Sequence, residues 1–348
     1  DLWAKYGARG TAAYEAGARS IARLFLTDTS RNLVRVFFLQ DRLKGLGGRA
    51  PKDLQRVHVV GAGVMGGDIA TWCALRGLDV TLQDRELKYV EPALARAKEY
   101  FDKRLKDETQ RAAALARLEA DVAGDGVPDA DVVIEAIYEN LDAKRALYAT
   151  LEPRMKAGAL LATNTSSIRL ELLAEGLADP GRLVGLHFFN PVAQMPLVEV
   201  VSGSATRAEV AAAALAFARR IDKLPLPCRS APGFVVNRVL TPYLQEAILA
   251  LEEGVPPAVI DRAALGFGMP MGPIELADVV GLDVSEHVGV IIAQELGRPV
   301  PELPALARHL AARELGRKSG RGFYEWRDGK AVKDDAGAAA APDDLGDR

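Results

Sequence analysis

Cysteine is scarce in this 348-residue chain, which has only Cys73 and Cys228. Their separation fits neither a metal-binding cluster nor a redox pair, and it favours a reducing compartment, the cytoplasm. Long hydrophobic runs are also lacking, because no apolar stretch reaches membrane-spanning length, and we find no signal-peptide pattern. Positive charge is not in excess, since the formal net charge is −3. This balance argues against a nucleic-acid surface or a basic membrane patch.

What is present is typical of a soluble globular protein with an ample core. Hydrophobic residues make up 49% of the chain and charged residues 26%. The first residue is Asp1 instead of methionine, and the last stretch, DDAGAAAAPDDLGDR, reaches no obvious stop. We therefore expect this chain to be a piece of a longer polypeptide.

The composition and the hydrophobic pattern of the sequence change along the chain, and these changes predict four regions. Residues 1–53 read as a leader of two successive helices, interrupted at TDTSRN, and then a Gly/Pro linker. Residues 54–230 alternate short apolar strands with helices, which indicates an open α/β sheet. Residues 231–327 carry only helical patterns. Residues 328–348, rich in Ala, Asp and Gly, are predicted to form a loose tail.

The individual elements follow from hydrophobic periodicity and from turn residues. We expect strands at 56–63, 78–84, 130–137, 159–165, 182–188, 196–203 and 222–228. We expect helices from about 64 to 76 and at 90–118, 141–155, 235–253, 256–265, 273–296 and 304–315.

The stretch VVGAGVMGGDIA places Gly61, Gly63 and Gly66 directly after a predicted strand and at the start of a helix. In a dinucleotide site the first glycine permits a tight turn, the second lets the backbone approach a pyrophosphate, and the third allows close helix packing. Asp84 ends the next strand, 21 residues after Gly63, where a carboxylate binds the ribose hydroxyls of NAD. Arg85 keeps NADP open as an alternative. The pattern predicts a Rossmann-type domain that binds NAD.

The segment LHFFNPVAQMPLVEV contains one histidine, His187, and one carboxylate, Glu199, among mostly apolar residues. His187 ends one predicted strand and Glu199 lies in the next, with two prolines in the link that let the chain double back. A carboxylate on one imidazole nitrogen fixes the tautomer and raises the basicity of the other, as an alcohol dehydrogenase requires. The alternative is a core histidine bonded to backbone, with Glu199 at a strand edge.

Two further polar stretches are candidates for the same site. ATNTSSI supplies Asn164, Ser166 and Ser167 at the end of a strand, where short donors could hold a carbonyl or hydroxyl group. SAPGFVVNRVL supplies Asn237 at the junction with the helical region. The alternatives are a helix cap for the first stretch and a capping or solvent-facing amide for the second.

No metal site is expected. His58 alternates within a strand and is best explained as structural. His287 and His309 lie on predicted helices without acidic partners at metal-ligand spacing.

Ordered motifs over about residues 54–326 resemble the L-3-hydroxyacyl-CoA dehydrogenase family, specifically the dehydrogenase part of multifunctional fatty-acid β-oxidation enzymes. The motifs are GAGVMGGDIA, VIEAIYENLDAK, NTSSI, HFFNPV, MPLVEVV, PGFVVNR and GFGMPMGPIELAD. The resemblance implies NAD-dependent oxidation of (3S)-3-hydroxyacyl-CoA to 3-oxoacyl-CoA by a Rossmann-type domain followed by an all-helical domain.

The resemblance also assigns residues. His187 resembles the general base and Glu199 its orienting carboxylate, while Ser166 and Asn237 resemble the residues that hold the C3 oxygen and thioester region. Asn190 resembles a further substrate-side amide, and Lys103 and Lys106 are weaker candidates for the CoA phosphates, with a solvated charged face as the alternative. The implied cofactor-binding set is Gly61, Gly63, Met65, Gly66, Asp84, Glu139, Lys144 and Asn164.

The leader segment TDTSRNLVRVFFLQDRLKGL resembles the helix that joins an enoyl-CoA hydratase domain to the dehydrogenase in the fused enzymes, and DDLGDR resembles the start of a second helical copy. The resemblance implies a hydratase domain on the full-length chain, a thiolase subunit as partner, and a possible homodimer. MPLVEV departs from many single-function relatives because Pro196 stands where they carry lysine.

Two other functions stay open at this point. A non-catalytic module could keep the fold without turnover, although both His187 and Glu199 are present. A dehydrogenase of this fold could also act on a different hydroxy acid without CoA. The acyl chain-length preference does not follow from the sequence.

Overall fold

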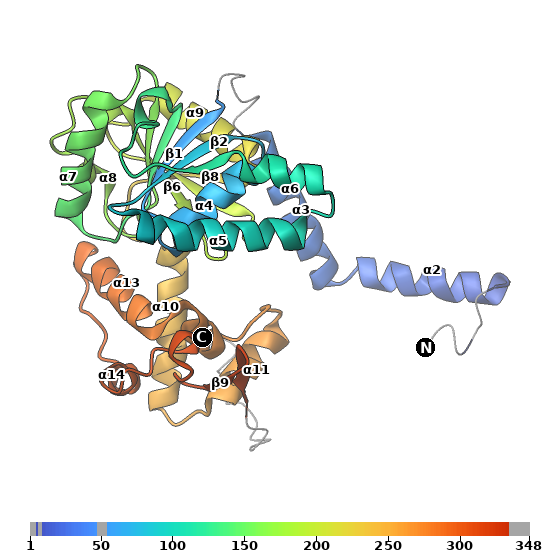
Figure 1. The fold of residues 1–348 in the computed structure, drawn as a ribbon. Coiled ribbons are helices and arrows are strands. Elements are labelled where there is room, and N and C mark those ends of the chain that lie inside the picture. Colours follow the sequence, from blue (N-terminus) through green and yellow to red (C-terminus); the bar gives the residue numbers. More distant parts are fainter. Residues whose placement is uncertain (1–4, 6–8, 47–53, 334–348) are drawn as a thin grey trace.

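The computed structural model describes Lys5, residues 9–46 and residues 54–333. Figure 1 shows an α/β domain above a helical domain, with two N-terminal helices forming an arm that projects from the α/β domain. This arrangement confirms the predicted fold class. The ends of the predicted leader and linker, and the tail beyond residue 333, lie outside the described residues.

The α/β domain is built on one eight-stranded sheet with the order β3-β2-β1-β4-β5-β6-β7-β8. Pairing is parallel except between β6 and β7, which run antiparallel. Strand residues are buried on both faces of the central strands, which explains their nearly continuous apolar sequences. The strands are β1 (Arg56–Val60), β2 (Asp79–Gln83), β3 (Leu118–Ala120), β4 (Val132–Glu135), β5 (Leu160–Thr163), β6 (Leu183–Phe188), β7 (Leu197–Ser202) and β8 (Leu224–Arg229).

Helices connect the strands and pack against the sheet. They are α4 (Val64–Leu75), α5 (Leu87–Arg104), α6 (Glu108–Leu115), α7 (Leu141–Leu151), α8 (Leu170–Ala174) and α9 (Ala208–Arg220), with short 3-10 turns η1 (Val127–Asp129), η2 (Glu152–Arg154) and η3 (Pro180–Arg182).

Two features of this region differ from the sequence prediction. The single helix predicted over 90–118 is broken, because Asp107 caps a new helix by accepting a hydrogen bond from the Gln110 amide. The chain then enters the edge strand β3. The prediction also lacks α9, an alanine-rich helix that packs against β7 and β8.

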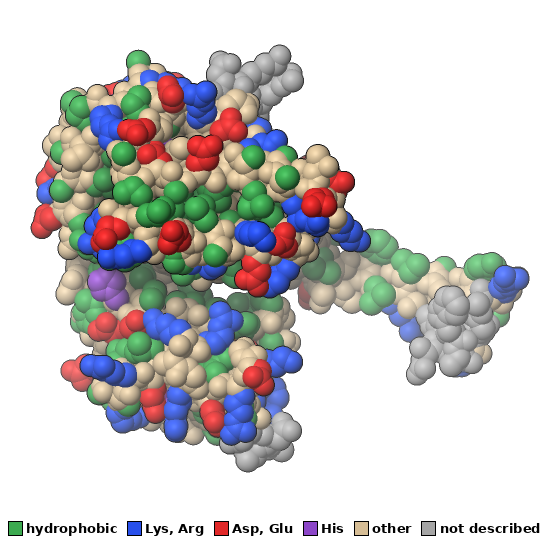
Figure 2. Space-filling view, viewed as in Figure 1, with side chains coloured by type: hydrophobic (Ala, Val, Ile, Leu, Met, Phe, Trp, Pro, Cys, Tyr) green, Lys and Arg blue, Asp and Glu red, His purple; other side chains and the backbone are tan. Residues whose placement is uncertain are grey.

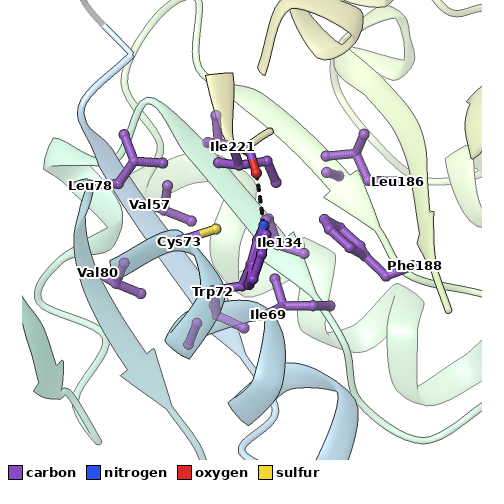
Figure 3. Packing of buried hydrophobic residues seen from close by; sticks show 14 of the residues in the cluster. Val57, Ile69, Trp72, Cys73, Leu78, Val80, Ile134, Leu186, Phe188 and Ile221 are labelled. Atoms are coloured by element: carbon purple, nitrogen blue, oxygen red, sulfur yellow. Dashed lines mark hydrogen bonds between the residues drawn. The ribbon is translucent and has the colours of Figure 1, made fainter. Parts of the chain in front are cut away.

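The core of the α/β domain lies between the sheet and α4, α5 and α9. Figure 3 shows Trp72 of α4 among Val57, Ile134, Leu186 and other buried side chains. The indole N–H of Trp72 donates to the Ile221 carbonyl oxygen at 2.8 Å, which satisfies the one polar group of this aromatic ring.

The helical domain follows the sheet. It consists of α10 (Val236–Glu252), α11 (Pro257–Phe267), α12 (Pro273–Val280), α13 (Leu282–Glu295), α14 (Pro304–Ala311), the turn η4 (Arg317–Ser319) and a hairpin of β9 (Glu325–Arg327) and β10 (Lys330–Val332). The helix predicted over 273–296 is divided at Gly281, whose φ of 104° lies in a region that favours glycine.

The hairpin adds two short strands to the predicted helical domain, and its second strand falls within the region 328–348 predicted as the tail. Buried Asp278 holds the hairpin by accepting hydrogen bonds from the backbone amides of Phe323 and Tyr324 and from the indole N–H of Trp326. These donors compensate for the burial of a carboxylate, which sequence patterns alone do not reveal.

The arm consists of α2 (Thr11–Phe25) and α3 (Asp28–Gly45), as the interruption at TDTSRN predicts. Thr27 separates them and caps α3 by accepting a hydrogen bond from the Ser30 amide. Hydrophobic side chains are visible along the projecting arm in Figure 2. Within the described ranges, no helix combines the length and the apolar character needed to cross a bilayer.

Candidate functional site

A cleft of about 1280 Å³ lies between the α/β domain and the helical domain. Figure 2 shows the hollow between the two bodies. One wall is formed where β1, β4, β5 and β6 end, the edge at which parallel sheets bind ligands. The other wall comes from α10, α12, α13 and α14. Predicted site residues that line the cleft are Gly63, Met65, Glu139, Asn164, Ser166, His187, Asn190 and Asn237.

The glycine turn has the geometry expected of a dinucleotide site. Gly61 has a φ of 104°, and an added Cβ would lie 2.6 Å from the Ala136 carbonyl oxygen. At Gly66 a Cβ would lie 1.8 Å from the Gly61 carbonyl oxygen, so strand and helix pack through the missing side chain. At Gly63 a Cβ would meet no protein atom within 4 Å. Gly63, the second glycine of the motif, therefore leaves open space beside its Cα on the cleft wall.

Asp84 reinforces this turn. One carboxylate oxygen accepts the Ala62 amide at 2.8 Å, and the other accepts the amide of Arg85 at 2.7 Å. The Arg85 guanidinium lies over the ring of Tyr89, 5.3 Å from its centroid. Gly63 is the N-cap of α4 and supplies no side chain there, so the first N–H groups of the helix can meet an anion. These residues fit the phosphates and ribose of NAD.

His187 and Glu199 are paired, as the sequence predicts. They are register partners on the antiparallel strands β6 and β7, and His187 Nδ1 lies 2.7 Å from Glu199 Oε2. The Glu199 carboxylate is fully buried, so its ionised form favours a hydrogen bond from Nδ1–H. The other ring nitrogen, Nε2, is then left to exchange a proton. The rings of Phe189 and Phe234 pack beside the imidazole at 4.6 and 5.7 Å between centroids.

Glu199 has a second function that the sequence did not reveal. Its Oε1 atom accepts hydrogen bonds from the backbone amides of Val235 and Val236, each at 2.9 Å. These amides begin α10, whose N-terminus is favourable for a negative charge. One buried carboxylate therefore joins the histidine of the α/β domain to the first helix of the helical domain.

The short polar side chains gather around the same part of the cleft. Asn237, on the first turn of α10, donates from Nδ2 to the Ser166 carbonyl oxygen at 3.3 Å. Asn164 accepts the amide of Phe188 at 2.9 Å and so ties β5 to the end of β6. Ser166 lies between the asparagines and is half-buried. The structure brings Asn164 and Ser166 to the wall that carries His187, and Asn237 to the facing wall formed by α10.

Glu139 organises the loop that contains Ser166. Its Oε1 atom accepts from the Thr165 hydroxyl at 2.6 Å and from the amides of Ser166 and Ser167 at 2.9 and 3.1 Å. Burial alone would raise the pKa of Glu139, but Lys144 and these donors outweigh it and hold the pKa below its usual value. Glu139 is thus an ionised anchor at the cleft wall.

Lys144 lies next to Glu139, which lines the cleft, but does not itself belong to the cleft lining. It is almost completely buried beneath the cleft wall, and its Nζ atom lies 2.6 Å from Glu135 Oε1 and 3.4 Å from Glu139 Oε2. Glu135 in turn accepts from Tyr148 and Thr163. Lys144 thus holds Glu135 and Glu139 in place, and its contact with the cofactor stays a prediction.

The lysines suggested for the CoA phosphates lie outside the cleft lining. Lys103 lies in the last turn of α5 and pairs with Glu99 at 2.6 Å, with most of its side chain in solvent. Neither Lys103 nor Lys106 lines the cleft in the described part of the chain. Both side chains are exposed, as on a solvated charged face, and a contact with the CoA phosphates stays a prediction.

The remaining histidines do not form a second centre. His58 is fully buried between the side chains of Thr81 and Gln83, and burial lowers its pKa. Among the described residues, no group of histidine, cysteine and acidic side chains is arranged to hold a metal ion.

Comparison with protein families gives two matches in chain order. Residues 56–231 match the NAD binding domain of 3-hydroxyacyl-CoA dehydrogenase. Residues 233–326 match the C-terminal domain of 3-hydroxyacyl-CoA dehydrogenase. The first match confirms that the predicted cofactor is NAD.

Among curated proteins, the chain is similar to fatty acid oxidation complex subunit alpha of Shewanella baltica, with 35% identity over 320 residues. The same named subunit of Pseudomonas aeruginosa is 35% identical over 332 residues. These alignments cover 90% and 92% of this chain but 45% and 46% of the relatives. The chain therefore spans less than half the length of these relatives.

Among solved structures, 3-hydroxybutyryl-CoA dehydrogenase from Escherichia coli K12 is 38% identical with a TM-score of 0.76, covering 83% of this chain and 63% of that one. The (S)-3-hydroxybutyryl-CoA dehydrogenase from Ralstonia eutropha is 36% identical with a TM-score of 0.74, covering 79% of this chain and 100% of that one.

Proposed function

The chain belongs to the 3-hydroxyacyl-CoA dehydrogenase family, and we propose that it oxidises (3S)-3-hydroxyacyl-CoA to 3-oxoacyl-CoA with NAD. The observation that carries the proposal is the pair of His187 and Glu199, 2.7 Å apart, on the wall of a cleft that also contains the glycine turn. Oxidation of an alcohol needs a base at the hydroxyl group and a hydride acceptor at the carbon. His187, which can act as the base, and the glycine turn, which can hold the hydride acceptor, line the same cleft.

His187 is the proposed general base. Nδ1–H donates to Glu199, so Nε2 carries the lone pair that takes the proton from the C3 hydroxyl group. The imidazolium formed in this step is stabilised by the buried carboxylate of Glu199. In the reverse direction the same Nε2–H returns the proton to the oxygen of a 3-oxoacyl group.

Ser166 and Asn237 are proposed to hold the substrate oxygens. The Ser166 hydroxyl group and the Asn237 amide come from opposite sides of the cleft and are linked by the 3.3 Å bond to the Ser166 carbonyl oxygen. A C3 oxygen placed between these donors and His187 would be oriented for proton transfer. Asn190, at the rim, is proposed as a further substrate contact.

NAD is proposed to be held by Gly61, Gly63, Met65, Gly66 and Asp84, with Glu139 and Asn164 towards the nicotinamide side. When bound, NAD supplies the acceptor for the hydride that leaves C3. The Asp84 carboxylate favours ribose hydroxyl groups and repels a 2′-phosphate, which is the basis for NAD over NADP.

We further propose that the full-length protein acts in fatty-acid β-oxidation, with an enoyl-CoA hydratase domain on the same chain and a thiolase subunit as partner. Support comes from the name of the relatives, fatty acid oxidation complex subunit alpha, and from the leader motif. The exposed apolar residues of α2 and α3 are compatible with such a neighbour. A homodimer and a cytoplasmic location stay predictions.

The proposal is tested by following the absorbance of NADH with acetoacetyl-CoA and, separately, with free acetoacetate. We expect rapid NADH consumption only with the CoA thioester. No reaction with either substrate would favour the non-catalytic alternative. Equal rates with both would favour a hydroxy-acid dehydrogenase that does not recognise CoA.

A further inference from the structure

Lys223 stands just before β8, and its ammonium group is almost completely buried beside the cleft. Nζ donates to the carbonyl oxygen of Val192 and, at 2.8 Å, to that of Met195. Both carbonyl groups belong to the segment 189–196 that connects β6 to β7. This segment lines the cleft through Phe189, Asn190, Pro191, Gln194 and Met195.

The other side of Lys223 meets the cofactor-binding half of the domain. Nζ lies 4.0 Å from the ring centroid of Trp72 on α4, the helix that begins at the glycine turn. Figure 3 shows the Trp72 ring held by its bond to the Ile221 carbonyl oxygen. The guanidinium carbon of Arg76 lies 4.3 Å from the same ring. Lys223 is therefore a polar link between α4 and the segment 189–196.

Burial of an ammonium group is costly, and a packing residue would not need one. In the described part of the chain, Lys223 forms no salt bridge, since nearby Asp222 pairs with Arg76 at 2.8 Å. The charge is instead matched by two carbonyl dipoles and one aromatic face. These partners are suited to holding the segment 189–196 in a fixed position relative to Trp72.

Charged and titratable groups around Lys223 come from α4 and the end of α9. Burial, aided by Arg76, lowers the pKa of Lys223 to about 8, while Asp222 and Cys73 act in the opposite direction. Burial raises the pKa of Cys73 to about 12, so this thiol is neutral. Arg220 donates to the Arg76 carbonyl oxygen. At neutral pH, Lys223 is thus the cation that faces the carbonyl oxygens of the segment.

We propose that Lys223 is a positioning residue that fixes the segment 189–196 against α4 and thereby shapes the acyl-CoA side of the cleft. The same segment joins the strand of His187 to the strand of Glu199. Its displacement would move Asn190 and Met195 away from the substrate while the glycine turn, at the other end of α4, stays in place. This inference rests on the proposed dehydrogenase function.

The test is Lys223→Met in the full chain, because methionine retains the apolar length and removes the donors. We expect the KM for acetoacetyl-CoA to rise by about tenfold, with the Kd for NADH, measured by fluorescence, within about twofold of the parent. Hydrogen exchange of the amides in 189–196 should accelerate, while that of α9 should not.

Lys156→Met is the matched control. Lys156 also donates to a carbonyl oxygen, that of Asp129, and to Asp131, but it lies beside the start of β4 and does not line the cleft. It should lower stability without changing the KM for acetoacetyl-CoA. An unchanged KM and unchanged exchange in Lys223→Met would overturn the proposal, as would equal KM changes in both variants.

A second variant covers the case in which Lys223→Met does not fold. Trp72→Phe leaves the bonds of Lys223 to the carbonyl oxygens but removes the indole bond to Ile221 and weakens the aromatic face. We expect a smaller rise in KM, about threefold, and faster exchange in 189–196. Exchange at the parent level would contradict the link. If the parent itself does not reduce acetoacetyl-CoA, the dehydrogenase proposal fails, whereas hydrogen exchange still decides whether Lys223 holds the segment.

Discussion

His187 and Glu199 face each other across the antiparallel pair β6–β7, with Nδ1 and Oε2 2.7 Å apart. The antiparallel pairing is needed for this contact, because it places the end of one strand opposite the middle of the next. The second oxygen of Glu199 binds the start of α10. Proton transfer and the attachment of the helical domain therefore depend on one side chain.

Glu199→Gln separates these two functions. The amide oxygen of glutamine can still accept from Val235 and Val236, but its NH2 group would face Nδ1 and place the ring proton on Nε2. We expect kcat to fall by about a hundredfold or more with only a small change in Tm.

Glu199→Ala is the comparison, because it also removes the acceptor at the start of α10. It should lose roughly 1–3 kcal/mol of unfolding free energy in addition to activity. Steady-state rates and thermal unfolding measure the two effects. Parent-like kcat in Glu199→Gln would show that the tautomer of His187 is not controlled by this residue.

The glycines of the turn are expected to respond differently to alanine. At Gly63 the added methyl group meets no protein atom within 4 Å, so stability should be preserved while NADH affinity falls by about tenfold. At Gly66 the methyl group would lie 1.8 Å from the Gly61 carbonyl oxygen, and we expect a loss of roughly 1–3 kcal/mol of stability. Fluorescence titration and thermal unfolding distinguish the two. Equal losses of stability would contradict this division of the motif.

Asp84→Asn tests the choice of cofactor. Asparagine keeps an acceptor for the Ala62 amide, which Asp84 binds at 2.8 Å, but it removes the charge that repels a 2′-phosphate. The ratio of kcat/KM for NADH to that for NADPH should fall by about tenfold or more. An unchanged ratio would mean that Arg85 or another residue decides the specificity.

Glu139 should make stability depend on pH. Lys144 and the loop donors keep its pKa in the folded state below the usual value, although burial opposes them. Ionised Glu139 therefore stabilises the fold above the usual glutamate pKa, and this contribution is lost as pH falls through the folded-state pKa. The Tm difference between the parent and Glu139→Gln should be largest near neutral pH and shrink in acid. Glu119→Gln, at an exposed position, is the control and should show no such trend.

Sequence patterns were sufficient for the parts of the site that depend on local structure. The glycine turn, the strand ends that carry Asn164 and His187, and the doubling back between His187 and Glu199 follow from short-range periodicity and turn residues. The motifs that carry these residues occur along the chain in the order that the family resemblance implies. Two domain matches confirm that resemblance. The α9 helix could have been found, since AEVAAAALAFARR is a strong helix-forming run.

Other features depend on long-range contacts that no local pattern records. The local sequence does not reveal the burial of Lys144 and Lys223, because each is buried against groups that are brought near by the fold. Lys103 is exposed instead, because it lies in the last turn of α5, where its side chain pairs with Glu99 in solvent. Burial of a charged residue is decided by distant partners, so it must be observed in the structure.

His187 is the base on which the proposed reaction depends, and His187→Gln removes its proton-transfer group. Glutamine keeps polarity and approximate size but cannot act as a base near neutral pH. We expect the rate of NADH consumption with acetoacetyl-CoA to fall by about a thousandfold, while the Kd for NADH changes by less than about twofold. A variant that binds NADH normally and reduces acetoacetyl-CoA at the parent rate would show that His187 is not the general base.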